Sequence, residues 1–120
     1  MGSPLIRDAP LQSEKEMKGG RKMATYMMQF GFTQQGIQKV KESPARVEAA
    51  KKTVRDLGGE VKAFYAILGS QYDTVFILEA LNDEAVAKMA LAIGSLSFVR
   101  TVTHRIFTED EFRKIVSSLP

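Results

Sequence analysis

A Tyr-Asp pair at the entrance of an apolar run is the part of this sequence best suited to chemistry. The turn Gly69-Ser70-Gln71 leads into Tyr72 and Asp73, and Tyr72–Ala80 reads as a strand. A phenol and a carboxylate in such a place either hydrogen-bond to nearby backbone amides or face a ligand. Both interpretations put Tyr72 and Asp73 where chain segments converge, so the pair is the first candidate for ligand binding.

Three further side chains complete the candidate ligand-binding set: Arg100, Tyr26 and His104. If Asp73 or His104 removed a proton and Tyr72 or Arg100 stabilised the resulting anion, the set could serve a cofactor-independent enzyme. His104 could also ligate haem. It shares its predicted face with apolar strand residues, however, as an ordinary structural histidine would. No catalytic residue is assigned from the sequence.

Composition removes several other classes of site. The 120 residues contain no cysteine and one histidine, so thiol nucleophiles, disulfides and thiolate metal sites are absent. No His-x-x-x-His or Glu-x-x-His spacing supports a zinc or iron site, and no Gly-x-Ser-x-Gly elbow supports a serine nucleophile. We therefore expect neither a metal nor a cofactor.

The charge distribution separates an N-terminal segment from the rest. Met1–Lys22 carries five basic and three acidic residues with two prolines, and it has no apolar period, so it is predicted to be a disordered leader or extension. Of the net charge of +3, the rest of the chain keeps only +1, without a basic stripe for nucleic acid. No apolar run approaches the roughly 20 residues that span a bilayer, so we expect no membrane contact and a cytoplasmic location.

The elements that must position the candidate residues follow one another from Met23 onward as strand, helix, strand, strand, helix, strand, helix, in one domain over residues 23–120. The predicted strands are Ala24–Phe30, Val61–Leu68, Tyr72–Ala80 and Phe98–Phe107. The first helix begins at Thr33 and restarts at Pro44, a residue suited to a first helical turn, and Gly58-Gly59 ends it. Asn82 and Asp83 cap the second helix, and a Thr108-to-Glu111 capping box starts the third.

Two strand–helix–strand units joined by a hairpin predict an α+β fold: a ferredoxin-like split βαβ antiparallel sheet with helices on one face and an extra C-terminal helix. The predicted order, fourth, first, third and second strand, brings Tyr72, Asp73 and Arg100 to one end of the sheet. His104 lies farther along, closer to Tyr26. Because the first three strands are apolar on both faces, the face without helices is expected to pair with a second copy.

Several segments in the same order resemble the GYD domain family, named for a Gly-Tyr-Asp signature. They are Met23-Ala24-Thr25-Tyr26, Phe32-Thr33-Gln34-Gln35-Gly36, Glu42-Ser43-Pro44-Ala45-Arg46, Gln71-Tyr72-Asp73 and Val99-Arg100-Thr101. The resemblance extends over Met23–Leu119 and implies a small bacterial-type dimeric α/β barrel without an established activity. Two residues separate Gly69 from Tyr72, one more than in the family's usual Gly-x-Tyr-Asp.

The function expected from these observations is that of a binding or assembly module. It would be a homodimer or higher homo-oligomer, with a small apolar ligand held in a cleft between facing sheets. The alternatives are a cofactor-independent enzyme of the antibiotic-monooxygenase-like or cyclase-like barrel type, and a haem-binding barrel that uses His104.

Overall fold

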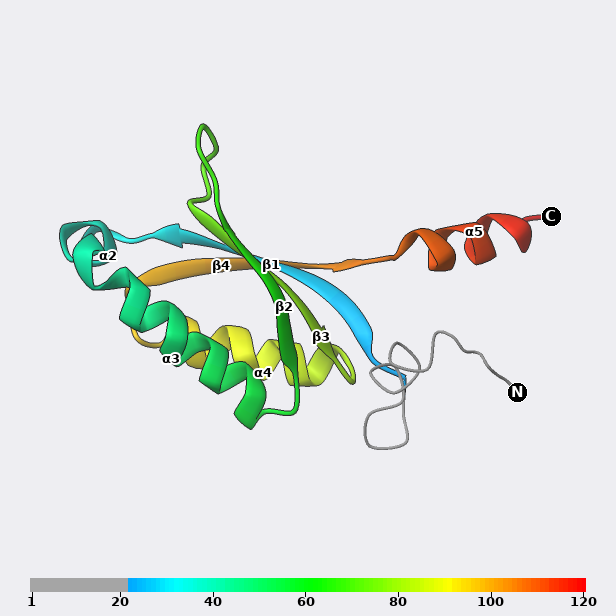
Figure 1. The fold of residues 1–120 in the computed structure, drawn as a ribbon, viewed down its shortest axis with the longest axis horizontal. Helices are drawn as coiled ribbons and strands as arrows, with labels where there is room; N and C mark the ends of the chain where they lie inside the picture. The colour runs from blue at the N-terminus through cyan, green and yellow to red at the C-terminus, as the bar shows by residue number, and fades with distance from the viewer. Residues whose placement is uncertain (1–21) are drawn as a thin grey trace.

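A computed structural model of the chain describes residues 22–120, which form a four-stranded sheet with helices against one side (Figure 1). The predicted leader, Met1–Lys22, lies outside the described residues except for Lys22. The elements are β1 (Ala24–Phe32), α2 (Gln34–Gln38), the 3-10 turn η2 (Val40–Glu42), α3 (Ser43–Asp56), β2 (Glu60–Ala66), β3 (Thr74–Ala80), α4 (Asp83–Gly94), β4 (Val99–Ile106) and α5 (Glu109–Ser117).

The sheet has the order β2-β3-β1-β4 with every neighbouring pair antiparallel, which confirms the predicted split βαβ topology. In the register, Phe30 lies between Thr74 of β3 and Thr101 of β4. Successive side chains on a strand point to opposite faces, so this register decides which candidate residues share a side of the sheet.

Both long helices cover the same face of the sheet, and the core lies between these layers (Figure 1). The largest fully buried side chains are Phe76, Met28, Leu78, Met89 and Val54. The rings of Phe30 and Phe64 pack edge-on against Phe76, with centroids 5.0 and 5.9 Å away. We call the other side of the sheet, which no helix of residues 22–120 covers, the open face.

The predicted first helix is divided into shorter pieces than its sequence pattern indicates. Thr33 caps α2 by accepting a hydrogen bond from the Gly36 N–H at 3.0 Å, but α2 ends at Gln38 and a 3-10 turn follows. A Cβ on Gly36 would lie only 2.0 Å from the Phe98 carbonyl oxygen. The close approach of these two backbones, which the residue pattern does not reveal, holds α2 against the start of β4. The proline restart of α3 and the left-handed Gly58 at its end agree with prediction.

The connection between β2 and β3 is longer than predicted. Both strands are shorter than their apolar runs, because β2 ends at Ala66 and β3 begins at Thr74. Residues 67–73 therefore form a loop that protrudes from one end of the sheet (Figure 1), with Gly69 at a φ of +88°. Tyr72 and Asp73 belong to the end of this loop, one step before the strand.

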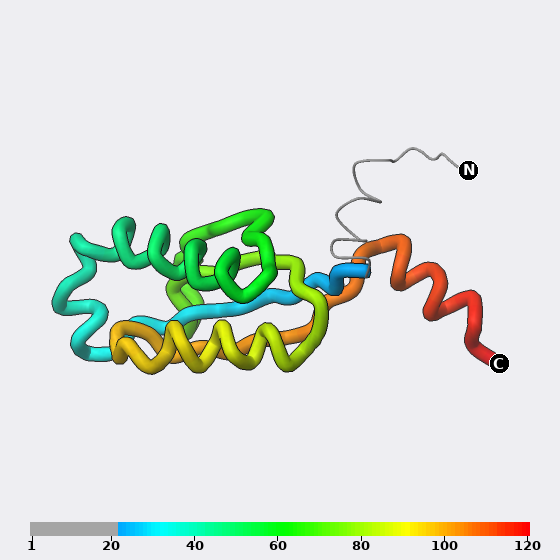
Figure 2. Tube along the Cα trace, turned by 90° about the horizontal axis from the view of Figure 1, so that it is seen from below, coloured from blue at the N-terminus to red at the C-terminus, as the bar shows by residue number. Residues whose placement is uncertain are grey.

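Helix α5 extends away from the body of the domain as a continuation of β4 (Figures 1 and 2). Its predicted capping box is present, with Thr108 Oγ1 accepting from the Glu111 N–H and Glu111 Oε1 accepting from the Thr108 N–H. One side of the helix is apolar and exposed, at Phe112, Ile115 and Val116, and exposed Leu119 follows its end. An isolated helix this short is marginal in water, so α5 needs a surface to pack against.

Candidate functional site

Asp73 ties together three segments at the end of the sheet. Its N–H donates to the Phe30 carbonyl at 2.7 Å, and its carbonyl accepts from the Ile67 N–H at 2.8 Å. Its carboxylate oxygen Oδ2 accepts from the Phe32 N–H at 2.8 Å. Because β1 continues two residues beyond the start of β3, the carboxylate replaces the carbonyl that a longer β3 would have offered to Phe32.

The Asp73 carboxylate hydrogen-bonds to a backbone amide, which is one of the two alternatives that the sequence left open. The donor, the Phe32 N–H, belongs to β1 and not to the turn that precedes Asp73. Within the turn, the Ser70 hydroxyl instead accepts from the Tyr72 N–H at 3.1 Å. Tyr72 is half-buried, and its hydroxyl has no hydrogen-bond partner among the described residues.

Arg100 reaches the same end of the sheet from the opposite side of β1. It pairs with Gly31, and a Cβ added to Gly31 would lie 2.6 Å from Arg100 Nη2 and 3.6 Å from the Gln71 carbonyl oxygen. The guanidinium therefore crosses β1 over a glycine, toward the loop that carries Tyr72. Among the ion pairs of the described residues, none joins Arg100 to Asp73.

Tyr26 and His104 are separated by the sheet itself. Tyr26 pairs with Arg105, so the neighbouring His104 pairs with Met27 and lies exposed on the open face. Tyr26 is buried on the helix side, where its hydroxyl donates to Asp83 Oδ1 at 2.5 Å. Burial and the Asp83 carboxylate raise the pKa of Tyr26 to about 12. A proton relay between these two residues would have to cross the backbone, so they do not form one site.

The open face carries apolar side chains from all four strands, with Gln29 and His104 among them. Its side chains follow from the register: Met27 and Gln29 on β1, Ala63 and Tyr65 on β2, Val75, Ile77 and Glu79 on β3, and Arg100, Val102, His104 and Ile106 on β4. The placement of His104 beside Val102 and Ile106 agrees with the sequence pattern. Because the side chain of Phe76 is buried in the core, the side chain of the next residue, Ile77, points to the open face.

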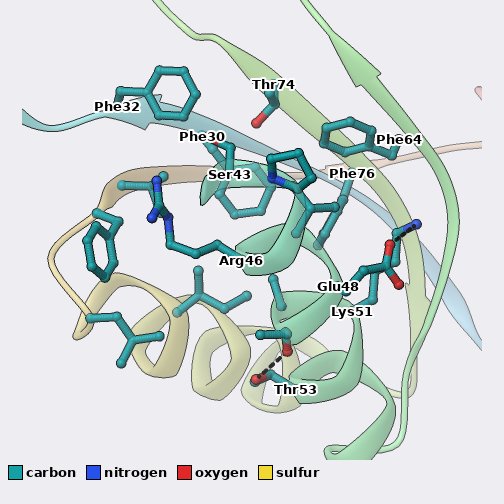
Figure 3. A pocket seen from close by; sticks show the side chains of 18 residues that line it. Phe30, Phe32, Ser43, Arg46, Glu48, Lys51, Thr53, Phe64, Thr74 and Phe76 are labelled. Carbon is teal, nitrogen blue, oxygen red and sulfur yellow. Dashed lines mark hydrogen bonds and ion pairs between the residues drawn. The ribbon is translucent and has the colours of Figure 1, made fainter. Parts of the chain in front are cut away.

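A cavity lies on the helix side, where the sequence did not predict one. We call it the α3 cavity; its volume is about 370 Å³, and it lies between α3 and one end of the sheet (Figure 3). Five phenylalanines from separate parts of the sequence line it: Phe30, Phe32, Phe64, Phe76 and Phe98. Only the three-dimensional fold gathers these rings, so no local motif could have identified the cavity.

A second, smaller cavity of about 240 Å³ lies beside the Tyr26–Asp83 hydrogen bond and includes Thr103 and Arg105. No group of three or more potential metal ligands occurs within residues 22–120. In the same range, no helix has the length and apolar character needed to cross a membrane.

Comparison with known proteins decides the family. A GYD domain profile matches residues 26–116, which include the Tyr72–Asp73 corner, the open face and most of α5. The chain belongs to the GYD domain family. This GYD domain is also 34% identical, over 82 residues, to the glutamine synthetase and cystathionine beta-lyase binding protein of Thermus thermophilus, with 68% of this chain and 85% of that protein covered.

The sheet-and-helix arrangement recurs in a regulator with little sequence similarity. The Mycobacterium tuberculosis leucine response regulatory protein, LrpA, matches with a TM-score of 0.56 and 15% identity. The match covers 90% of this GYD domain's chain but 61% of that regulator, less than two thirds of its length. At this identity the likeness establishes a shared fold and nothing about DNA or effectors.

Proposed function

We propose that this GYD domain is a cytoplasmic binding and assembly module that forms homo-oligomers through its open face and recruits other proteins. The observation that carries the proposal is the open face itself, to which all four strands contribute apolar side chains, with Gln29 and His104 among them, while both long helices lie on the other side. A sheet normally buries such a face against another layer. A second copy of the same sheet is the simplest layer available.

The open face is too small to form a stable interface by itself. Strands of seven to nine residues, spaced about 4.8 Å apart, give a footprint of roughly 500 Å². A stable interface buries about 800 Å² on each partner. The exposed apolar side of α5 can supply the remainder if it packs on the second copy, and this would also stabilise an otherwise isolated helix.

Protein partners are the second part of the proposal. The similar Thermus thermophilus protein is named for binding glutamine synthetase and cystathionine beta-lyase, and the aligned region covers most of that protein. We therefore propose that enzymes of this type, from amino-acid metabolism, are partners of this GYD domain as well. The proposed ligand corner formed by Tyr72, Asp73 and Arg100 lies at one end of the open face, where it could contact such a partner.

The chemistry of the candidate residues favours binding over proton abstraction. The Asp73 carboxylate already accepts the Phe32 N–H, and the Tyr26 phenol stays protonated at neutral pH. His104 lies on the opposite side of the sheet from Tyr26 and is exposed, outside the residues that line the α3 cavity. Within a single chain, these positions give neither a base in a closed site nor an enclosed haem ligand.

The test measures the molecular mass by light scattering for variants that carry a new charge on the open face or on α5. Ile77→Lys puts an ammonium group at the centre of the open face and should shift the mass toward a monomer near 13.3 kDa. Ile115→Glu on α5 should weaken the oligomer as well. Lys52→Glu, on the exposed side of α3, is the control and should leave the mass unchanged.

A wild-type monomer at micromolar concentration would contradict the proposal of self-association. The protein partners are tested separately, by titrating the wild-type domain into purified glutamine synthetase and cystathionine beta-lyase from the same organism and following sedimentation. If neither enzyme changes its sedimentation, the proposed partner class is wrong, whatever the oligomeric state.

A further inference from the structure

The α3 cavity has the composition of a small-molecule site. Its volume of about 370 Å³ lies at the lower end of the ~300–1,000 Å³ typical of ligand pockets, which suits a metabolite-sized molecule. Phenylalanine rings form much of its wall, and α3 contributes Pro44, Val47 and Ala50 (Figure 3). The cavity is partly open to solvent and its wall is mostly apolar, which favours an apolar ligand.

A buried hydroxyl in the cavity wall has no partner. Ser43 Oγ, at the first turn of α3, is inaccessible and makes no hydrogen bond within the described part of the chain. Such a group costs free energy unless a ligand or water satisfies it. The Thr74 hydroxyl also belongs to the lining, and Figure 3 shows both residues next to the phenylalanine rings. The cavity is therefore apolar with a small number of polar groups, as in sites that orient a ligand.

Arg46 brings a guanidinium to the edge of the cavity. Its guanidinium lies over the Phe98 ring, 4.2 Å from the centroid, and its Nη2 donates to the Lys39 carbonyl at 2.9 Å. Its Nη1 forms a long ion pair of 3.4 Å with Glu42 Oε1, whose side chain is 64% exposed, so a ligand carboxylate has only a weak pair to displace. These contacts hold the arginine side chain in place with 22% of it exposed. The two other charged residues of the lining, Glu48 and Lys51, pair with each other at 3.4 Å. A fixed guanidinium beside an apolar space favours a carboxylate.

We propose that the α3 cavity binds a small aromatic or branched aliphatic monocarboxylic acid. The apolar part lies among the phenylalanine rings, and the carboxylate lies at the Arg46 end. The Ser43 hydroxyl is inaccessible in this conformation, and a rotation about its χ1 bond is needed before it can donate to a ligand oxygen. This site is distinct from the open face and lies on the other side of the sheet, so it can be occupied while that face is engaged.

Two probes of similar shape distinguish binding through the carboxylate from binding through the apolar part of the ligand. 3-Phenylpropionate carries the carboxylate, and 3-phenylpropan-1-ol is its neutral counterpart. Each is titrated into the isotopically labelled full-length protein while backbone and methyl NMR signals are followed. The carboxylate should bind saturably, shift signals of Val47 and Thr74, and bind about tenfold more tightly than the alcohol.

Variants of α3 then locate the site. Arg46→Gln should weaken 3-phenylpropionate about tenfold and leave the alcohol unchanged. Ala50→Phe should fill the cavity and abolish binding of both probes. Ala45→Phe, on the exposed part of the same helix and outside the lining, is the matched control and should bind like wild type.

Three results would overturn the inference. They are the absence of saturable shifts up to the solubility limit of the probes, shifts confined to the open face, and an Arg46→Gln protein that binds the carboxylate as tightly as wild type. If Ala50→Phe does not fold, the comparison of the two probes on Arg46→Gln still decides the question.

Discussion

Replacing Asp73 distinguishes its structural role from a role in binding. In Asp73→Ala the Phe32 N–H loses its acceptor, while the two backbone bonds of residue 73 remain. An unsatisfied, partly buried donor costs about 1–3 kcal/mol. Asp73→Asn keeps a side-chain oxygen within reach of the same N–H, so it should lose less than about 1 kcal/mol. We therefore expect the free energy of unfolding to decrease from wild type to Asp73→Asn and further to Asp73→Ala.

The measurement is urea unfolding followed by circular dichroism at fixed protein concentration, because self-association would otherwise shift the midpoint. Asp56→Ala is the matched control. Among the described residues its carboxylate pairs with exposed Lys52 alone, at 2.7 Å, an ion pair worth no more than about 0.5 kcal/mol. If Asp73→Ala is as stable as the Asp56→Ala protein, the Phe32 hydrogen bond does not hold the end of the sheet and the reasoning is refuted. A loss of partner binding in the stable Asp73→Asn protein would instead support the ligand corner.

Two further predictions concern buried contacts. The pKa of Tyr26 is raised to about 12 in the folded state, so its phenol contributes up to about 2–3 kcal/mol to the free energy of unfolding below pH 10. This contribution is lost as the pH rises from 10 to 12, so the unfolding midpoint of wild type should fall more steeply over this interval than that of Tyr26→Phe. Parallel curves for the two proteins would contradict the prediction. Gly36→Ala should destabilise the domain by more than about 2 kcal/mol, because the new Cβ would clash with the backbone carbonyl of Phe98. In Gly31→Ala the new Cβ would clash with the movable end of the Arg100 side chain, so this change should cost about 1 kcal/mol or less. Thermal unfolding compares the two variants, and equal losses of stability would show that the Phe98 backbone moves to accommodate the methyl group.

The sequence predicted the topology because each element carries its own signal. The capping box of α5, the Asn82 cap of α4 and the glycines after α3 all depend on residues close together in the chain, and the structure confirms each one. The same holds for the strand order, which follows once two strand–helix–strand units are recognised. The segments that resemble GYD domains predicted the family, and the profile match over residues 26–116 confirms it.

The details that failed depend on contacts between distant residues. The end of β1 is fixed by the Asp73 carboxylate and the approach of Gly36 to Phe98, and neither is visible as a local pattern. The strand order places His104 close to Tyr26 along the sheet, but the exact pairing of β1 with β4 decides that the two side chains face opposite sides. A shift of one residue would have reversed this result.

The protruding loop between β2 and β3 provides a natural position for a spectroscopic label. Leu68 at its tip is fully exposed, and the chain has no cysteine, so Leu68→Cys introduces a single thiol per protomer. Two nitroxides in a dimer would then report the relative direction of the two sheets. A short separation means that the tips lie side by side, and a long one means that they lie at opposite ends, so a pulsed dipolar measurement can determine the symmetry of the assembly in solution.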